Sequence, residues 1–233
     1  LNMGNTAQLS ARERITSLFD NNSFVEIGAL VTRRSTDFNL RQKETPGDGV
    51  ITGYGLIDGN LIYVYSQDAS SLSGTIGEMH ARKITHIYDL ALKVGAPVIG
   101  LIDCAGLRLE EATDALNAFG EIYLKQSISS GVILQVTAIF GNSGGGVSVS
   151  AALSDFTFMT KQANLFISSP NTLESNYKDK LDTSKADFQA NGGLVDFVGE
   201  DDADVLEQIR TLITILPSNN EDDASYDECT DDL

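Results

Sequence analysis

Residues 132–154, which read VILQVTAIFGNSGGGVSVSAALS, hold the pattern that decides the fold. The apolar run 132–140 is typical of a buried β-strand. It is followed by a turn that ends in three glycines, and residues 147–154 are small and compatible with a helix. The same order occurs one unit earlier, where residues 98–108 read VIGLIDCAGLR. A strand, turn and helix that recur at about 35–40 residues predict stacked β/α units around a shared core.

The segments on either side fit the same α/β class. Asp58-Gly59 lies between two strand-like runs and is a strong hairpin signal. Residues 78–94 carry an apolar stripe at helical spacing, and Gly95-Ala96-Pro97 ends that helix. The further predicted elements are helices at 9–20, 110–128 and 200–214, and strands at 23–30, 49–56, 60–67, 98–102, 155–160 and 164–167.

The charge of the chain excludes one class of partner. Its 233 residues contain 16 Lys and Arg against 33 Asp and Glu, a formal net charge of −17. Nucleic acid as the main partner requires a positive surface, so we exclude it. Residues 219–233 hold seven of the acids and no Lys or Arg. We predict one domain over residues 1–218 and an acidic tail or linker over 219–233, with partner binding as the alternative role of the tail.

The cysteines and the apolar runs indicate the compartment. Two cysteines, Cys104 and Cys229, make no disulfide framework, and no His/Cys cluster indicates a metal. The N-terminus lacks a basic segment followed by an apolar one, and no apolar run approaches the ~20 residues of a membrane span. We expect a cytoplasmic protein that binds no metal.

The glycine turn at Gly144, Gly145 and Gly146 is the most informative candidate site. Glycines leave backbone N–H groups open, and such groups between a strand and a helix can bind a phosphate or an enolate oxygen. The GxxxxGK[ST] and GxGxxG spacings are both missing. Tight strand–helix packing is the alternative explanation of the glycines. The turn at residues 103–108 follows a neighbouring strand, so we expect both turns at the same edge of the sheet, facing one cleft.

Side-chain chemistry is less well supported. Cys104 as a nucleophile lacks a following His, so a small buried residue is the simpler interpretation. A triad of Ser143 with His80 or His86 lacks a GxSxG elbow. His80 follows a glycine-rich segment, and either lines a site or is a half-buried helix residue. The basic pairs Arg33-Arg34 and Arg82-Lys83, with Arg41 and Lys43, predict either an anion site or ordinary solvated surface.

Several ordered segments resemble one family, the carboxyltransferases of biotin-dependent acyl-CoA carboxylases and of the related sodium-pump decarboxylases. The resemblance covers roughly residues 9–220 and matches the N-terminal half of these proteins. The segments that carry it are Arg14–Asp20, Ser23–Glu26, Thr36–Phe38, Pro46–Gly55, Gly77–Ile84, Leu90–Leu101, Ala151–Met159 and Leu216–Asn220.

The resemblance implies a crotonase-like fold, a spiral of ββα units, and carboxyl transfer between N1 of biotin and the α-carbon of an acyl-CoA. It assigns the biotin carbonyl to the N–H groups of Gly145 and Gly146, and the acyl-CoA site to Ala105, Gly106 and Leu107. We add Gly144, Arg108, His80, Arg33, Arg34, Arg82 and Lys83 as expected substrate-binding residues. The implied partners are an acyl-CoA, a biotin carboxyl carrier protein, a C-terminal carboxyltransferase half and further copies in an oligomer, with membrane association only through a decarboxylase complex.

The sequence departs from the family pattern at the first turn. The usual Asp-Ser-Gly-Gly-Ala-Arg is Asp103-Cys104-Ala105-Gly106-Leu107-Arg108 here, so larger side chains stand where the family keeps small ones. The second turn, usually Pro-Cys-Ala-Gly-Gly-Ala, keeps its Gly-Gly pair as Gly145-Gly146. The first hypothesis is therefore a carboxyltransferase half, and the second a non-catalytic acyl-CoA-binding or assembly subunit. A hydrolase or isomerase that uses Glu110 or Glu111 is the third.

Overall fold

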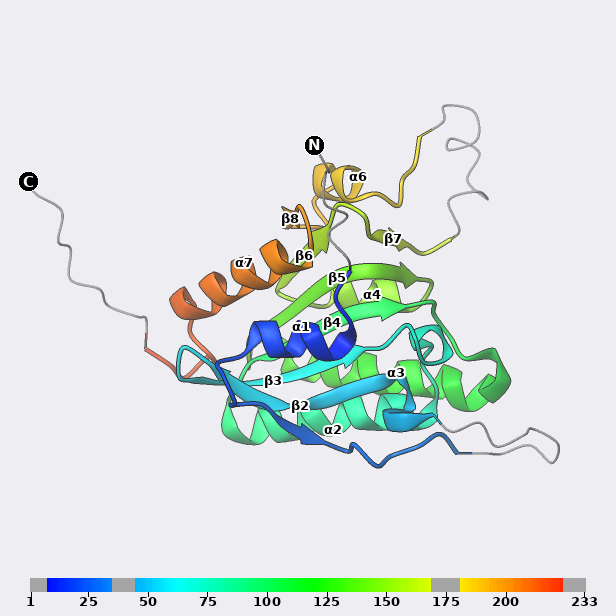
Figure 1. Ribbon diagram of the computed structural model, residues 1–233, viewed down its shortest axis with the longest axis horizontal. Coiled ribbons are helices and arrows are strands. Elements are labelled where there is room, and N and C mark those ends of the chain that lie inside the picture. The colour runs from blue at the N-terminus through cyan, green and yellow to red at the C-terminus, as the bar shows by residue number, and fades with distance from the viewer. Residues whose placement is uncertain (1–7, 35–44, 169–180, 224–233) are drawn as a thin grey trace, which may run out of the picture.

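The computed structural model describes residues 8–34, 45–168 and 181–223, and they form one sheet flanked by helices (Figure 1). The order of the strands in this sheet is β1-β2-β3-β4-β5-β6-β8, with β7 paired to β5. The strands are β1 (Val25–Ile27), β2 (Val50–Ile57), β3 (Asn60–Gln67), β4 (Val98–Cys104), β5 (Gln135–Gly144), β6 (Phe156–Thr160), β7 (Asn164–Phe166) and β8 (Phe197–Gly199). β1, β2 and β3 pair antiparallel, and from β3 onward every pair is parallel. The predicted stack of β/α units is confirmed.

Helices cover both faces of the sheet (Figure 1). They are α1 (Ala11–Leu18), α2 (Glu78–Val94), α3 (Ala112–Ser129), α4 (Val147–Ala152), α6 (Ala186–Asn191) and α7 (Asp202–Ile215). Val98 and Ile102 of β4 pack in the cluster that includes α2 and α3, whereas Ile99 and Leu101 pack with α1 and α7. This alternation follows from the two-residue period of a strand, and because both faces are covered, β4 has no polar side chain from Val98 to Ile102.

The hairpin between β2 and β3 turns at Asp58 and Gly59, as predicted. Their φ angles are 48° and 82°, which suits the two left-handed positions of a two-residue hairpin turn. The carboxylate of Asp20 accepts hydrogen bonds from both of their N–H groups, at 3.2 and 3.1 Å. The hairpin is thereby fixed to the end of α1, and the strands pair from Ile57–Asn60 to Val50–Gln67.

Two regions differ from the sequence prediction. β5 continues to Gly144, beyond the expected end at Phe140, because residues 142–144 pair with residues 164–166 of β7. The short elements α6 and β8 were not expected, since they have only six and three residues and little periodicity. The other helices and strands named above match the prediction to within a few residues, and α2 spans residues 78–94 as predicted.

The first residues of the acidic segment contact the domain. The N–H of Asn220 donates to the Val132 carbonyl at 3.0 Å, and the Asn219 amide donates to the Gly95 carbonyl at 2.8 Å. The boundary placed between 218 and 219 stays a prediction. Arg41, Lys43, Cys229 and the 36–38 motif lie outside the described residues.

No helix within the described ranges combines the length and apolarity that a membrane span requires.

Gly100 of β4 has a specific packing role, which gives a test of the fold. A Cβ at this position would lie 2.3 Å from the hydroxyl of Tyr65, whose side chain is buried in the core. We expect Gly100→Ala to lower the free energy of unfolding by roughly 1–3 kcal/mol through overpacking. The measurement is urea denaturation.

Gly120 is the matched control for this substitution. It lies in α3, and a Cβ there meets no atom within 4 Å. Gly120→Ala is expected to raise the free energy of unfolding by up to about 1 kcal/mol, because alanine is the better helix former. Equal effects of the two substitutions would contradict the packing argument.

Candidate functional site

The first turn leaves the end of β4 at Cys104. Its backbone is held by the preceding loop, since the N–H of Ala105 donates to the Ser73 carbonyl at 3.0 Å and the N–H of Ile76 donates to the Gly106 carbonyl at 2.9 Å. Gly106 has a φ of 112°, a conformation that favours glycine. Ala105 is exposed at the tip of the turn, while Leu107 packs against the core. The turn therefore presents backbone and one methyl group.

The second turn joins β5 to α4. Gly145 adopts a φ of 63°, which lets the chain change direction between the strand and the helix. A Cβ at Gly146 would lie 2.8 Å from the Tyr123 hydroxyl of α3, so the glycine permits a close approach of the helix. Close packing therefore explains the glycine at 146, and the left-handed backbone explains the glycine at 145.

The two turns are neighbours in space. Cys104 of β4 pairs in register with Ser143 of β5, and a Cβ on Gly106 would lie 3.4 Å from the Gly144 carbonyl oxygen. The prediction that both turns lie at one edge of the sheet is confirmed. A ligand at this edge is therefore within reach of both turns.

The two predicted N–H donors differ in availability. The N–H of Gly145 donates to the Phe166 carbonyl at 2.9 Å, so it is already used in the sheet. The N–H of Gly146 has no acceptor among the described residues. In this structure Gly146 alone of the two has an unused N–H, and the assignment of the biotin carbonyl to both N–H groups stays a prediction.

Arg108 is buried in an ion-pair network, and its expected contact with substrate stays a prediction. Its guanidinium is buried and contacts Asp48 at 2.7 Å, Glu111 at 2.8 Å and the Thr75 carbonyl at 2.7 Å. Burial raises the pKa of Asp48, and the charge of Arg108 opposes that rise. Arg108 therefore clamps the first turn to the loop before α2.

His80 is also buried and does not line the site. Its ring Nδ1 lies 2.9 Å from the Asp48 carbonyl, and Nε2 lies 3.2 Å from the side-chain amide of Gln67. The Asp48 carbonyl only accepts, so the ring carries its proton on Nδ1 and accepts at Nε2. Burial lowers the pKa of His80 to about 3. A neutral, enclosed imidazole excludes His80 as the base of a triad with Ser143.

The thiol of Cys104 is similarly unsuited to nucleophilic chemistry. It is fully buried, and burial raises its pKa to about 12. A thiol must be ionised to attack, so Cys104 is a packing residue at the end of the strand.

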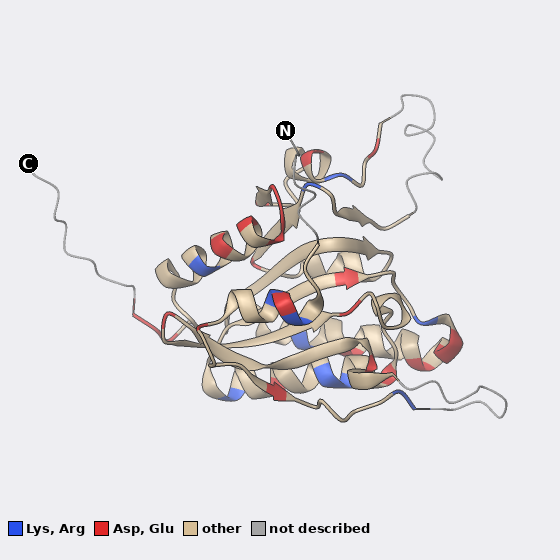
Figure 2. Cartoon of the chain, in the orientation of Figure 1, with Lys and Arg blue, Asp and Glu red and all other residues tan. Residues whose placement is uncertain are grey.

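Basic and acidic positions are interspersed along the described chain (Figure 2), and three of the predicted basic residues are paired with acids. Arg33 contacts Glu110 at 2.7 Å, and both Arg34 and Arg82 contact Glu78, at 3.2 and 2.9 Å. The buried ammonium of Lys83 donates to the carbonyls of Gly47 and Val50, and burial lowers its pKa to about 8. Each of these four residues thus already has a partner within the chain, and their expected contact with substrate stays a prediction.

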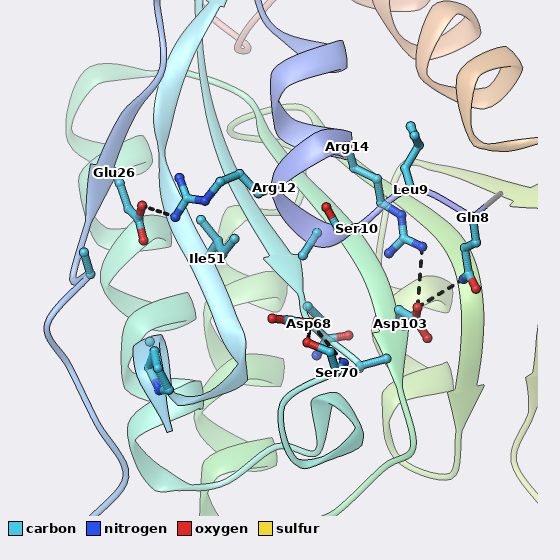
Figure 3. Close-up of a pocket in the computed structure, with 16 residues that line it drawn as sticks. Gln8, Leu9, Ser10, Arg12, Arg14, Glu26, Ile51, Asp68, Ser70 and Asp103 are labelled. Carbon is cyan, nitrogen blue, oxygen red and sulfur yellow. Dashed lines mark hydrogen bonds and ion pairs between the residues drawn. The ribbon is translucent and has the colours of Figure 1, made fainter. Parts of the chain in front are cut away.

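A polar cavity that sequence reasoning missed lies at the carboxyl ends of β3 and β4, on the α1 face (Figure 3). Its volume is about 470 Å³. Arg14 is buried beside it, 2.9 Å from Asp202 and 3.5 Å from Asp103. Burial raises the pKa of Asp103, which also accepts from the Gln8 amide at 3.2 Å. The one feature of the sequence that could have indicated this cavity is the charged residue Asp103 at the end of an apolar run.

Metal chemistry has no candidate ligands in the ordered core. Across the described residues, no three His, Cys, Asp or Glu side chains come together to hold a metal ion.

Comparison with known sequences gives a consistent picture. The family model for the carboxyl transferase domain matches residues 5–233. Methylmalonyl-CoA decarboxylase subunit alpha of Propionigenium modestum is 41% identical over 233 residues, which cover 98% of this chain and 45% of that protein. The mitochondrial propionyl-CoA carboxylase beta chain of Rattus norvegicus is 40% identical over 232 residues, with coverages of 96% and 43%. The chain thus spans less than half the length of these relatives.

Comparison with solved structures confirms the predicted crotonase-like fold. Transcarboxylase 12S, solved as a hexamer assembly with methylmalonyl-CoA and methylmalonic acid bound, superposes with a TM-score of 0.90 at 34% identity and covers 97% of this chain and 45% of its own. A Pseudomonas malonate decarboxylase hetero-tetramer in complex with malonate superposes with a TM-score of 0.78 at 24% identity, covering 88% of this chain and 82% of its own. The second likeness concerns the fold alone.

The buried position of Arg108 predicts a large effect on stability. In Arg108→Met, Asp48 and Glu111 stay buried without their counterion, so we expect the free energy of unfolding to fall by roughly 3–5 kcal/mol. Arg82→Met is the control, because Arg82 makes an exposed pair with Glu78 and its loss costs about 0–1 kcal/mol. Urea denaturation at pH 7 measures both variants. A similar fall in the free energy of unfolding for the two would contradict the role given to the buried ion pairs of Arg108.

The buried neutral His80 predicts a pH dependence of stability. Its pKa of about 3 lies below the ordinary value, so the unfolded chain binds the extra proton first. Stability from this group is fully present above about pH 6.5 and is lost as the pH falls from there toward 3. We expect His80→Asn to flatten the dependence between pH 7.5 and 5.5, as measured by denaturation. His86→Asn, at an exposed position on the same helix, is the matched control substitution.

Proposed function

The chain belongs to the carboxyl transferase domain family, and from this premise we propose that it binds an acyl-CoA thioester and the carboxylated biotin of a carrier protein. In this proposal it acts with a C-terminal half in carboxyl transfer between them. The observation that carries the proposal is the pairing of the two turns, with the N–H of Gly146 unused beside the Ala105–Leu107 turn.

The names of the relatives support the substrate class. They act on methylmalonyl-CoA or propionyl-CoA by name, and further relatives are biotin-dependent acetyl-/propionyl-coenzyme A carboxylase subunits from Mycobacterium. The transcarboxylase structure contains methylmalonyl-CoA. A short-chain acyl-CoA is therefore the first candidate for this chain.

The geometry fits chemistry that needs no side-chain acid or base. The biotin ureido group and the thioester each develop negative charge on a carbonyl oxygen during carboxyl transfer. A fixed backbone N–H aimed at such an oxygen lowers the barrier, by about 2.7–4 kcal/mol for one donor. Gly146 supplies this donor at the second turn in our proposal. The buried states of His80 and Cys104 agree with a mechanism that requires neither.

The proposed site is incomplete in this chain. The chain spans about 45% of the relatives' length, and in our proposal a segment that corresponds to their remaining half supplies the N–H donors for the thioester oxygen. We propose that this half contacts the same edge of the sheet, in a hetero- or homo-oligomer that also receives the biotin carrier. Cytoplasmic location and membrane association through a decarboxylase complex stay part of this proposal.

The second candidate function is an acyl-CoA-binding or assembly subunit without turnover. The observation in its favour is that the Gly145 N–H is occupied by the Phe166 carbonyl. The third hypothesis loses support, because Glu110 pairs with Arg33 and Glu111 accepts from Arg108 and from the N–H of Glu78. Neither carboxylate is free to act as a general base.

Calorimetric titration with propionyl-CoA, beside CoA alone, tests the proposal. For the chain with its C-terminal half we expect a dissociation constant in the micromolar range. This corresponds to a binding free energy of about −8 kcal/mol. Ala105→Trp, at the exposed tip of the first turn, is expected to weaken binding at least tenfold because the indole fills the acyl site. Thr211→Trp, on an exposed position of α7, is the control that leaves binding unchanged.

Turnover separates the two candidate functions. Carboxyl transfer to free biotin by the assembled halves supports the carboxyltransferase, whereas tight binding without transfer supports the binding subunit. The absence of propionyl-CoA binding at millimolar ligand, both alone and with the C-terminal half, would refute both.

A further inference from the structure

The peptide unit that carries the Gly146 N–H is held from its other end. The carbonyl of Gly145 accepts two hydrogen bonds from Ser148, one from the backbone N–H at 3.2 Å and one from the hydroxyl at 2.6 Å. In a planar trans peptide the C=O and the N–H point in opposite directions. Ser148 therefore fixes the direction in which the Gly146 N–H points.

The next peptide unit is held from a different element. The hydroxyl of Tyr123 in α3 donates to the Gly146 carbonyl at 2.6 Å, and the N–H of Val149 donates to the same oxygen at 3.1 Å. This fixes the N–H of Val147 by the same geometry. Tyr123 contacts Phe119 with ring centroids 5.9 Å apart, so its own position is defined by packing.

These hydrogen bonds restrict a turn that would otherwise be conformationally variable. Gly144, Gly145 and Gly146 follow one another, and glycine has the largest backbone freedom of any residue. A donor stabilises a developing charge best when it is already oriented and needs no reorganisation. Without external contacts, this run of glycines would spread the Gly146 N–H over several directions.

We propose that Ser148 and Tyr123 are positioning residues, whose hydroxyls hold the Gly146 and Val147 N–H groups in the orientation that the reaction requires. This inference rests on the proposed function of the second turn. Both hydroxyls donate to backbone carbonyls on the turn, so in this proposal they act through the backbone. Ser148 holds the peptide unit before the Cα of Gly146, and Tyr123 holds the peptide unit after it. We therefore expect the effects of substituting the two residues on kcat to be non-additive.

The test combines turnover with a direct measurement of backbone order. In the complex with the C-terminal half, Ser148→Ala and Tyr123→Phe are each expected to lower kcat for carboxyl transfer about five- to tenfold and to leave KM for the acyl-CoA unchanged. Ser148→Thr keeps the hydroxyl and is expected to restore kcat. By ¹⁵N relaxation of the chain alone, the order parameter of the Gly146 N–H is expected to fall from the ~0.85 of rigid backbone toward 0.6 in the two deletion variants.

Thr214→Ala is the matched control. The Thr214 hydroxyl makes the same kind of bond, to the Thr211 carbonyl at 2.7 Å, but on the exposed side of α7. It is expected to change neither kcat nor the Gly146 order parameter. A loss of order at Gly146 with unchanged kcat, or a loss of kcat with unchanged order, overturns the inference.

The order parameter also separates this inference from the function on which it rests. If the wild-type complex transfers no carboxyl group, the proposed function fails. The relaxation data then still decide whether the two hydroxyls orient Gly146, and unchanged order in both deletion variants rejects the bracing itself.

Discussion

The buried guanidinium of Arg108 connects the parts of the structure on which the site depends. It joins Asp48 at the start of the hairpin, Thr75 in the loop before α2, and Glu111 before α3. The two carboxylates also complete the start of α2, because Asp48 accepts from the N–H of His80 and Glu111 from the N–H of Glu78. The residue before that helix, Gly77, has no side chain to do this, and a Cβ there would lie 2.4 Å from Glu111. A buried ion pair contributes little net stability, but it fixes geometry, which is what the first turn requires.

A second buried network performs the same task on the opposite face of the sheet. Arg14 of α1 contacts Asp202 of α7 and Asp103 at the end of β4, and stacks over the ring of Phe140, 4.6 Å from its centroid. Asp103 lies at the start of the first turn. Its position is held by Arg14 of α1, which is in turn held by Asp202 of α7. A Cβ on Gly141 would lie 2.0 Å from the Asp103 carboxylate, so any larger residue here requires that carboxylate to move. The carboxyl edge of β4 is thus held from both faces, which leaves the turn little freedom.

The sequence predicted what depends on local pattern and failed where distant side chains meet. The limits of α2 follow from its apolar stripe and from Gly95, and the hairpin follows from Asp58-Gly59, so both were correct. The meeting of the two turns was predictable because parallel strands place their carboxyl ends together. The role of Arg108 was missed because its partner Asp48 lies 60 residues earlier, and burial of that pair leaves no trace in spacing. The strand residues 141–144 were missed because their glycines indicate a turn, whereas pairing with β7 extends the strand.

A site built from backbone donors places unusual demands on the rest of the chain. Burial and nearby charge set the pKa of an acid or base, as the lowered pKa of His80 shows. A backbone N–H does not titrate, so its effect as a donor depends on the direction of its peptide plane. Residues that orient peptide planes therefore have the role that charged neighbours have in sites built from acidic or basic side chains. The Phe166 carbonyl removes the Gly145 N–H from the site, and Ser148 turns the next N–H outward. Since each contact acts on one peptide unit, the turn holds defined N–H directions in a segment that glycine alone would leave variable.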